Sequence, residues 1–335
     1  MNSGFVDILP LGDQGYQSDS KPLVYAFGSN KKNVKDLVDW VKIKKEEIIT
    51  NLNTHGAILF RGFPVESDID FDTFVNAFEM NNLDYRDTLS NAVRINRTPR
   101  VFTANESPPD VSIFLHHELA QTTVYPSHLF FYCEQPPDGG GETPICRSDI
   151  LLDKLENSIP LFVKKCVKLG VRYTNIIPSK KDQDSGQGRS WQDTLSVSDM
   201  ISAETILKDL NYSWKWLDDD SLKVITCPLP AIRVLPNGSK VFFNQLIAAF
   251  EGWNDKRNKS EESISFGDGS EISKEHMKKA CKLSDEISFD LSWEKNDIVI
   301  INNMMVMHGR KPFVGRRSIL ASLAMEDQEG PKFNN

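Results

Sequence analysis

Hydrophobic and polar positions alternate with a helical period near the start of the chain. Over 33–52, apolar side chains recur three or four positions apart with charges between them, which predicts an amphipathic helix. The apolar run that follows, GAILFRGFP at 56–64, is bounded by glycine and proline and predicts a short strand. Helical spacing returns over 71–81. Residues 1–30 precede these elements, and we expect them to form an N-terminal extension.

The pattern changes at about residue 112, where short apolar runs separated by Pro, Gly and Asn predict strands. Pro-Asn-Gly at 236–238 lies between two alternating runs and predicts a β-hairpin. Two polar, glycine-containing segments, 178–192 and 253–271, are predicted to be loops or a lid. The predicted strands cover 128–134, 170–177, 231–244, 297–309 and 317–325, and the predicted helices cover 148–168, 197–209 and 272–285.

The order of these elements indicates the fold class. No strand–helix–strand unit repeats along the chain, so we expect an α+β fold that is mainly β, with one β-rich core and helices packed outside it. The 335 residues, of which 39% are hydrophobic and 26% charged, are enough for a substantial core. We therefore expect a single domain over 1–335.

Charge and hydropathy exclude two classes of partner. The formal net charge is -8 and the basic runs are short, so the chain lacks the basic face that nucleic acids require. The sequence contains no run of about 18 consecutive apolar residues, the length needed to cross a membrane, and its N-terminus lacks the pattern of a signal peptide. The five cysteines form no CxxC pair and are typical of reduced thiols. We expect a cytoplasmic protein that binds neither nucleic acid nor membrane.

The segment FLHHELAQ places His116, His117 and Glu118 side by side. On a strand, side chains two positions apart share a face, so His116 and Glu118 would converge while His117 points away and packs. His308, at the end of the apolar run DIVIINNMMVMHG, is the candidate third ligand. Two histidines and one carboxylate suit non-haem Fe(II) and leave three coordination positions open. The alternative, that the HxE pair is an accident of surface or packing, stays open on these residues alone.

Two further residues favour the metal interpretation. Thr143 follows the glycine triplet in GGGET and offers a hydroxyl to a carboxylate. Arg317 lies in the strand after His308 and offers a planar, bidentate partner to the same group. Together they would hold an acid whose other end chelates the metal. The glycine run could instead be only a turn, and Arg317 only part of a solvated arginine pair.

The ordered series resembles the TauD/TfdA family of Fe(II)- and 2-oxoglutarate-dependent dioxygenases, within the clavaminate synthase-like superfamily, over about 54–326. Stretches such as FTANESPPD, GRSWQDT and GWNDKRN are similar to the branch of plant clavaminate synthase-like proteins and the syringomycin-pathway aspartate hydroxylase. The family's metal-binding residues correspond to His116, Glu118 and His308, and its 2-oxoglutarate-binding residues correspond to Thr143 and Arg317.

The resemblance implies a double-stranded β-helix, or jelly-roll, core with flanking and inserted helices. It implies Fe(II), with 2-oxoglutarate and O2 as cosubstrates, and hydroxylation of an unactivated C–H bond with release of succinate and CO2. The implied substrate is a small polar molecule of specialised metabolism, such as an amino acid, free or carrier-bound, or a derivative. Glu118 is retained, whereas related halogenases replace this carboxylate. Ala321 stands where taurine dioxygenase has its sulfonate-binding arginine, so taurine is not the expected substrate.

Two alternatives to hydroxylation are compatible with the sequence. The same site could catalyse desaturation or cyclisation, or the chain could be a noncatalytic protein that binds a metal or an oxo acid. Polar residues in the loops around the motifs and on the predicted hairpin are the candidate substrate contacts. They are Asn105, Glu106, Gln121, Arg189 and Asn244.

Overall fold

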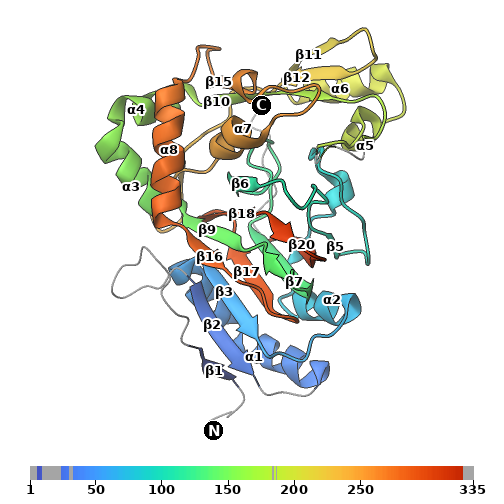
Figure 1. Cartoon of the computed structure of the whole chain (residues 1–335), viewed down its shortest axis with the longest axis vertical. Helices are drawn as coiled ribbons and strands as arrows, with labels where there is room; N and C mark the ends of the chain where they lie inside the picture. The colour runs from blue at the N-terminus through green and yellow to red at the C-terminus, as the bar shows by residue number, and fades with distance from the viewer. Residues whose placement is uncertain (1–5, 10–23, 30–32, 183–184, 186, 327–335) are drawn as a thin grey trace.

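Strands form the middle of an elongated molecule, and helices lie at both of its ends (Figure 1). Most of the predicted N-terminal extension, 1–30, lies outside the residues that the structure describes, as do 183–184 and 186 of the predicted loop 178–192. The structure is a computed structural model that describes residues 6–9, 24–29, 33–182, 185 and 187–326.

A large mixed sheet crosses the half of the molecule that contains the N-terminus (Figure 1). Its neighbouring strands pair antiparallel except for the pair formed by residues 24–28 and 57–61, which is parallel. The strand order is β1 (Val6–Ile8), β2 (Val24–Ser29), β3 (Ala57–Arg61), β17 (Ile298–Asn302), β7 (His128–Gln135), β20 (Ser318–Met325) and β4 (Asn81–Asn82), with β5 (Phe102–Thr103) also paired to β20.

A smaller antiparallel sheet packs against the large one. One core cluster joins the two sheets, because it contains Phe131 and Val299 of the large sheet together with Ile145 and Val306 of the smaller one. The strand order of the smaller sheet is β16 (Phe289–Leu291), β9 (Thr143–Arg147), β18 (Val306–Arg310) and β6 (Ile113–His116).

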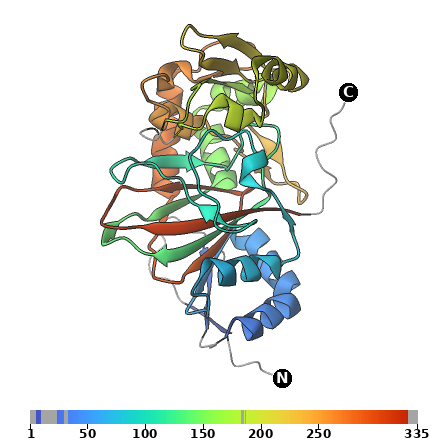
Figure 2. The same ribbon diagram turned by 90° about the vertical axis from the view of Figure 1, so that its right-hand side faces the viewer.

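The central strands of the large sheet are buried on both faces, which explains their nearly continuous apolar sequences. Along β7, Phe131 enters the core between the sheets, whereas Phe130 packs on the opposite side. That opposite side is covered by α1 (Val34–His55) and α2 (Asp68–Asn76), as Figure 2 shows. The side chain of Asn33 caps α1, and Gly56, in a left-handed conformation, ends it.

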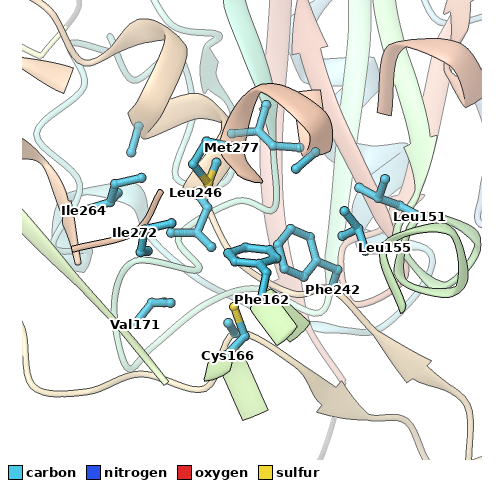
Figure 3. Close-up of a cluster of buried hydrophobic side chains, with 14 of the residues drawn as sticks. Leu151, Leu155, Phe162, Cys166, Val171, Phe242, Leu246, Ile264, Ile272 and Met277 are labelled. Atoms are coloured by element: carbon cyan, nitrogen blue, oxygen red, sulfur yellow. The ribbon is translucent and has the colours of Figure 1, made fainter. Parts of the chain in front are cut away.

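A second helical layer covers the far side of the smaller sheet. Its core contains Phe162, Phe242, Leu246 and Met277, all fully buried (Figure 3). The helices that contribute to it are α3 (Ser148–Ser158), α4 (Pro160–Leu169), α7 (Leu246–Gly252) and α8 (Lys274–Ile287).

The remaining elements form the end of the molecule opposite the N-terminus and several short connections. The end is a four-stranded sheet of β11 (Ser213–Trp216), β12 (Leu222–Ile225), β10 (Val171–Ile177) and β15 (Ile264–Phe266), next to α5 (Trp191–Leu195) and α6 (Met200–Asp209). The short elements are η1 (Tyr85–Asp87), η2 (Ser260–Glu262), and the strand pairs β13 (Arg233–Val234) with β14 (Lys240–Val241) and β8 (Gly139–Gly140) with β19 (Phe313–Val314).

The structure corrects three predicted boundaries. The single strand predicted over 297–309 is wrong: the run breaks at 303–305 into β17 and β18, which belong to different sheets. The helix predicted over 148–168 is two helices, because Pro160 starts a new one. The segment 253–271, predicted as a loop, contains η2 and β15.

No helix among the described residues is long and apolar enough to cross a membrane. All five cysteines are free thiols.

His128, at the start of β7, makes stability depend on pH. Its side chain is buried, its Nε2 lies 3.6 Å from Oε1 of Glu326 without a hydrogen bond, and burial lowers the pKa of His128 to about 4. On acidification, His128 therefore binds a proton near pH 6.5 in the unfolded chain, but only near pH 4 in the folded protein. The stability that neutral His128 contributes is present above pH 6.5 and is lost as the pH falls toward 4.

We expect the free energy of unfolding of the wild type to fall on acidification by up to about 1.4 kcal/mol per pH unit more than that of His128→Gln. Urea unfolding at several pH values between about 7 and about 5 measures both slopes. Carboxylates titrate in both proteins, so the difference isolates His128. Equal slopes would show that the buried imidazole does not matter.

Candidate metal centre

Three side chains from two neighbouring strands meet at one point. His116, the last residue of β6, is paired in register with His308 of β18, and the centroids of the two rings are 4.4 Å apart. Glu118 follows β6, and its Oε2 lies 3.7 Å from the Nε2 atom of each histidine. One possible ligand atom from each residue lies within 4.8 Å of the others.

The spacing of these atoms and their protonation fit a metal ion. Two donors bound at right angles to one ion lie about 3 Å apart when each metal–donor distance is about 2.1 Å, so the separations of 3.7 Å, and of up to 4.8 Å within the set, require the side chains to close on the ion. The Nδ1 atom of His116 lies 2.8 Å from the carbonyl of Phe114, so Nε2 is the ring nitrogen that faces Glu118. Burial and the neighbouring His116 lower the pKa of His308, which keeps it neutral.

Glu118 does not reach this point as the strand argument predicted. β6 ends at His116, and the chain turns immediately afterwards, with Leu119 at a φ of 59°. The prediction that His116 and Glu118 converge because they alternate along one strand is therefore wrong in its reason. A clamp on the backbone of Glu118 sets the position of this residue instead.

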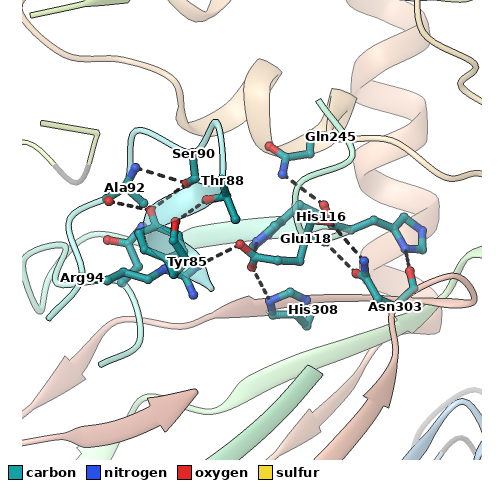
Figure 4. Close-up of polar contacts among 12 residues, drawn as sticks. Tyr85, Thr88, Ser90, Ala92, Arg94, His116, Glu118, Gln245, Asn303 and His308 are labelled. Atoms are coloured by element: carbon teal, nitrogen blue, oxygen red, sulfur yellow. Dashed lines mark hydrogen bonds and ion pairs between the residues drawn. The ribbon is translucent and has the colours of Figure 1, made fainter. Parts of the chain in front are cut away.

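The clamp is the amide of Asn303, in the turn between β17 and β18 (Figure 4). Its Oδ1 accepts a hydrogen bond from the Glu118 backbone N–H at 2.7 Å, and its Nδ2 donates to the Glu118 carbonyl at 3.1 Å and to the Pro126 carbonyl at 2.7 Å. The backbone carbonyl of Asn303 accepts from Nδ1 of His117, which is buried and packs against Phe243. One turn therefore holds the chain on both sides of the ligand.

The carboxylate of Glu118 is paired with a buried arginine. Nη2 of Arg94 donates a hydrogen bond to Oε1 of Glu118 at 2.8 Å (Figure 4). Burial alone would raise the pKa of Glu118, but the charge of Arg94 and the nearby His116 and His308 outweigh it and hold that pKa well below its usual range. The carboxylate is therefore ionised at neutral pH.

A cavity of about 60 Å³ adjoins the three side chains, and Thr143 and Arg317 also line it. The hydroxyl of Thr143 accepts a hydrogen bond from Nε1 of Trp293 at 3.0 Å, which leaves its proton free to donate. Nε of Arg317 donates to the carbonyl of Gly141 at 3.1 Å. Burial, and then repulsion from Arg310, lowers the pKa of Arg317 to about 10, so it remains charged at neutral pH.

The glycine triplet makes room for this arrangement. Gly141 has a φ of 71°, and a Cβ there would lie 3.1 Å from Cδ of Arg317. Gly140 has a φ of 69°, and a Cβ there would lie 2.4 Å from the carbonyl oxygen of Pro312. Both positions therefore require glycine.

A second cavity, of about 320 Å³, shares His116, Glu118 and Arg94 with the first. Asn105 and Gln121 line it, and Oε1 of Gln121 has no hydrogen-bond partner. These are the two predicted substrate contacts that the structure brings to the candidate centre.

The other three predicted contacts lie elsewhere. The side chain of Asn244 bonds to the backbone of Ala231 and Leu246, and the residue that faces the cavity is its neighbour Gln245. Glu106 is exposed and lines neither cavity. Arg189 donates to backbone carbonyls, including those of Thr88 and Ser90, and lines a third cavity, of about 900 Å³, which shares Ala92 and Arg94 with the second.

Four residues that shape the centre were not identified from the sequence. Arg94 and Trp293 lie in segments without a recognisable motif, so only their tertiary contacts reveal them. Asn303 could have been found, because an Asn-Asn pair inside the apolar run DIVIINNMMVMHG is a turn signal. Gln245 follows the residue that was chosen.

Solved structures share this fold. The chain aligns with AAD-2, crystallised with Mn(II) and N-oxalylglycine, with a TM-score of 0.52, 11% identity and coverage of 97% of this chain and 98% of the other. It aligns with a taurine dioxygenase from Burkholderia xenovorans with a TM-score of 0.51, 13% identity and coverage of 97% and 91%. The chain therefore shares the fold of these proteins, with mixed helices and many strands.

The family described as taurine catabolism dioxygenase TauD, TfdA family, matches residues 19–323, and the chain belongs to it. It is an Fe(II)- and 2-oxoglutarate-dependent dioxygenase. A clavaminate synthase-like protein of Arabidopsis thaliana is 38% identical over 284 residues, which cover 84% of this chain and 86% of that protein. The dapdiamide synthesis protein DdaC of Enterobacter agglomerans is 28% identical over 287 residues, which cover 81% and 83%.

Replacing Asn303 tests the clamp. Asn303→Ala removes three hydrogen bonds and leaves the buried backbone groups of Glu118 without partners, so we expect the free energy of unfolding to fall by about 3 kcal/mol. The same change at Asn237, in the exposed hairpin, should cost less than about 1 kcal/mol. Urea unfolding compares the two, and similar losses would contradict the clamp.

Proposed function

We propose that this protein hydroxylates an unactivated C–H bond of a small polar substrate, such as an amino acid or a derivative, and forms succinate and CO2. One observation carries the proposal: a single cavity is lined by the three metal-ligand candidates and by both candidates for binding 2-oxoglutarate. The relatives named as a clavaminate synthase-like protein and as a dapdiamide synthesis protein support a small, amino-acid-like substrate.

His116, Glu118 and His308 would hold Fe(II) on one face. Two neutral imidazoles and one carboxylate are the donor set that non-haem Fe(II) oxygenases use, and three positions stay open for the 2-oxo acid and O2. When bound, the metal supplies the oxidising chemistry that removes hydrogen from carbon. The balanced reaction converts R–H, 2-oxoglutarate and O2 into R–OH, succinate and CO2, with one oxygen atom in the alcohol and the other in succinate.

The chain's own residues bind and orient the reactants. Arg317 and the Thr143 hydroxyl would bind the carboxylate of 2-oxoglutarate that is far from the metal. Asn105 and Gln121 would contact the substrate in the second cavity, of about 320 Å³, because both line it next to His116 and Glu118. Gln245 joins them as a candidate in place of Asn244. This 320 Å³ cavity would position one C–H bond of the substrate beside the metal.

Three broader features belong to the same proposal. The two packed sheets would be the double-stranded β-helix of the family. The whole chain would act as one domain, because the family match covers residues 19–323. The free thiols agree with action in the cytoplasm.

His308→Ala tests the metal site. The assay uses Fe(II), 2-oxoglutarate and a panel of amino acids, free and carrier-bound. We expect succinate release to fall at least about 100-fold, because removing one of the three protein ligands weakens binding of the metal and changes its coordination. Succinate detection measures turnover, and chelator treatment of the wild type should have the same effect.

His276→Ala, in α8 and outside both cavities, is the matched control and should keep full turnover. Product mass then separates the reactions: a gain of about 16 indicates hydroxylation and a loss of about 2 indicates desaturation. A wild type that never releases succinate would favour the noncatalytic alternative.

Thr143→Val tests the cosubstrate site. The valine lacks the hydroxyl but keeps the shape, so we expect the KM for 2-oxoglutarate to rise roughly 10-fold while kcat changes little. Trp293→Phe removes only the donor that orients this hydroxyl and should give a smaller rise. Steady-state kinetics with varied 2-oxoglutarate measures both. An unchanged KM in Thr143→Val would remove Thr143 from the site.

A further inference from the structure

The two carboxylate oxygens of Glu118 have different surroundings. Oε2 faces the Nε2 atoms of His116 and His308, at 3.7 Å from each. Oε1 faces away from them and accepts the hydrogen bond from Nη2 of Arg94 at 2.8 Å. The side chains of Arg94 and Glu118 are only 7% and 6% exposed, so water does not screen this ion pair.

Arg94 is itself held in place. Its guanidinium carbon lies 4.6 Å from the ring centroid of Tyr85 and 5.2 Å from that of Phe102. The Tyr85 hydroxyl donates to the carbonyl of Ala92 at 2.6 Å, two residues before Arg94 (Figure 4). On the other side, Ile95 and Thr103 of β5 exchange two hydrogen bonds, which fix the backbone next to Arg94 to the large sheet. The guanidinium therefore cannot follow Glu118 if the carboxylate rotates.

A carboxylate can give a metal ion one oxygen or both. Giving both would turn Oε1 of Glu118 toward the metal and leave the buried guanidinium without its partner, which costs several kcal/mol. We propose that Arg94 is a positioning residue that restricts Glu118 to one metal-bound oxygen. This inference rests on the proposed function, because it concerns the same metal site.

The restriction matters for the number of open positions. Three protein donors leave three positions on a six-coordinate ion, enough for the two atoms of a chelating 2-oxo acid and for O2. A second oxygen from Glu118 would take one of the three. Arg94 also lines the 60 Å³ and 320 Å³ cavities, so it lies between the open metal positions and the proposed substrate site.

A purely structural role for Arg94 makes a different prediction. If Arg94 only stabilised the fold, its loss would loosen all three ligands and weaken metal binding. If it restricts Glu118, its loss frees an oxygen and removes a positive charge, so metal binding stays as tight or becomes tighter while an open position is lost.

The test counts the exchangeable water molecules on Mn(II) bound to the protein, by water-proton relaxation. We expect about three for the wild type and about two for Arg94→Met, with the Kd for Mn(II) unchanged or lower. The Kd of the Mn(II)-loaded protein for 2-oxoglutarate should rise roughly 10-fold. The water count distinguishes the two roles of Arg94, because removing its positive charge would also weaken binding of the 2-oxoglutarate anion directly.

Arg94→Lys keeps the charge and one donor, and it should restore a count near that of the wild type. If Arg94→Met does not fold, Arg94→Gln is measured, since its shorter amide cannot reach Oε1 as Arg94 does, and the lower count is expected there too. An unchanged count in the folded variant, or a Kd for Mn(II) at least 10-fold higher, overturns the role of Arg94 alone. A wild type that does not bind Mn(II), or that binds it equally well as His308→Ala, overturns the metal site itself.

Discussion

Burying the carboxylate of Glu118 would cost several kcal/mol if its charge had no compensating partners, and much of the surrounding structure provides them. Arg94 pairs with one oxygen, His116 and His308 face the other, and Asn303 satisfies both backbone groups. These groups are far apart in sequence. The buried charge can therefore exist only after the large and small sheets have packed together.

The turn at 303–305 links the two sheets to the centre. It carries the chain from β17 in the large sheet to β18 in the smaller one, and β18 brings His308 into register with His116 of β6. The amide in the same turn holds Glu118. One short connection thus sets the relative positions of all three candidate ligands, and a change in the packing of the sheets would move them together.

Positive charge exceeds negative charge around the smaller cavity. Arg94 is balanced by Glu118, but Arg310 and Arg317 are not paired with acids and donate instead to backbone carbonyls. Burial lowers the pKa of each of these two arginines to about 10, which leaves both charged at neutral pH. A divalent cation would add to the excess. An anionic ligand such as a dicarboxylate is the kind of molecule that would balance it.

Local sequence was sufficient to predict much of the fold and the types of residue in the centre. Apolar periodicity located α1, β7 and β20, and the motifs singled out His116, Glu118, Thr143, His308 and Arg317, which the structure brings to one cavity. The residue types and their order carried that information because ligand and carboxylate-binding chemistry restricts which side chains can serve. The apolar run continues on both sides of Asn303, so periodicity alone did not locate the break there, and only the Asn-Asn pair marked it. No sequence pattern identified Arg94 or Trp293. These residues act through contacts with partners 24 and 150 positions away, and only tertiary packing decides which distant groups lie within hydrogen-bonding distance.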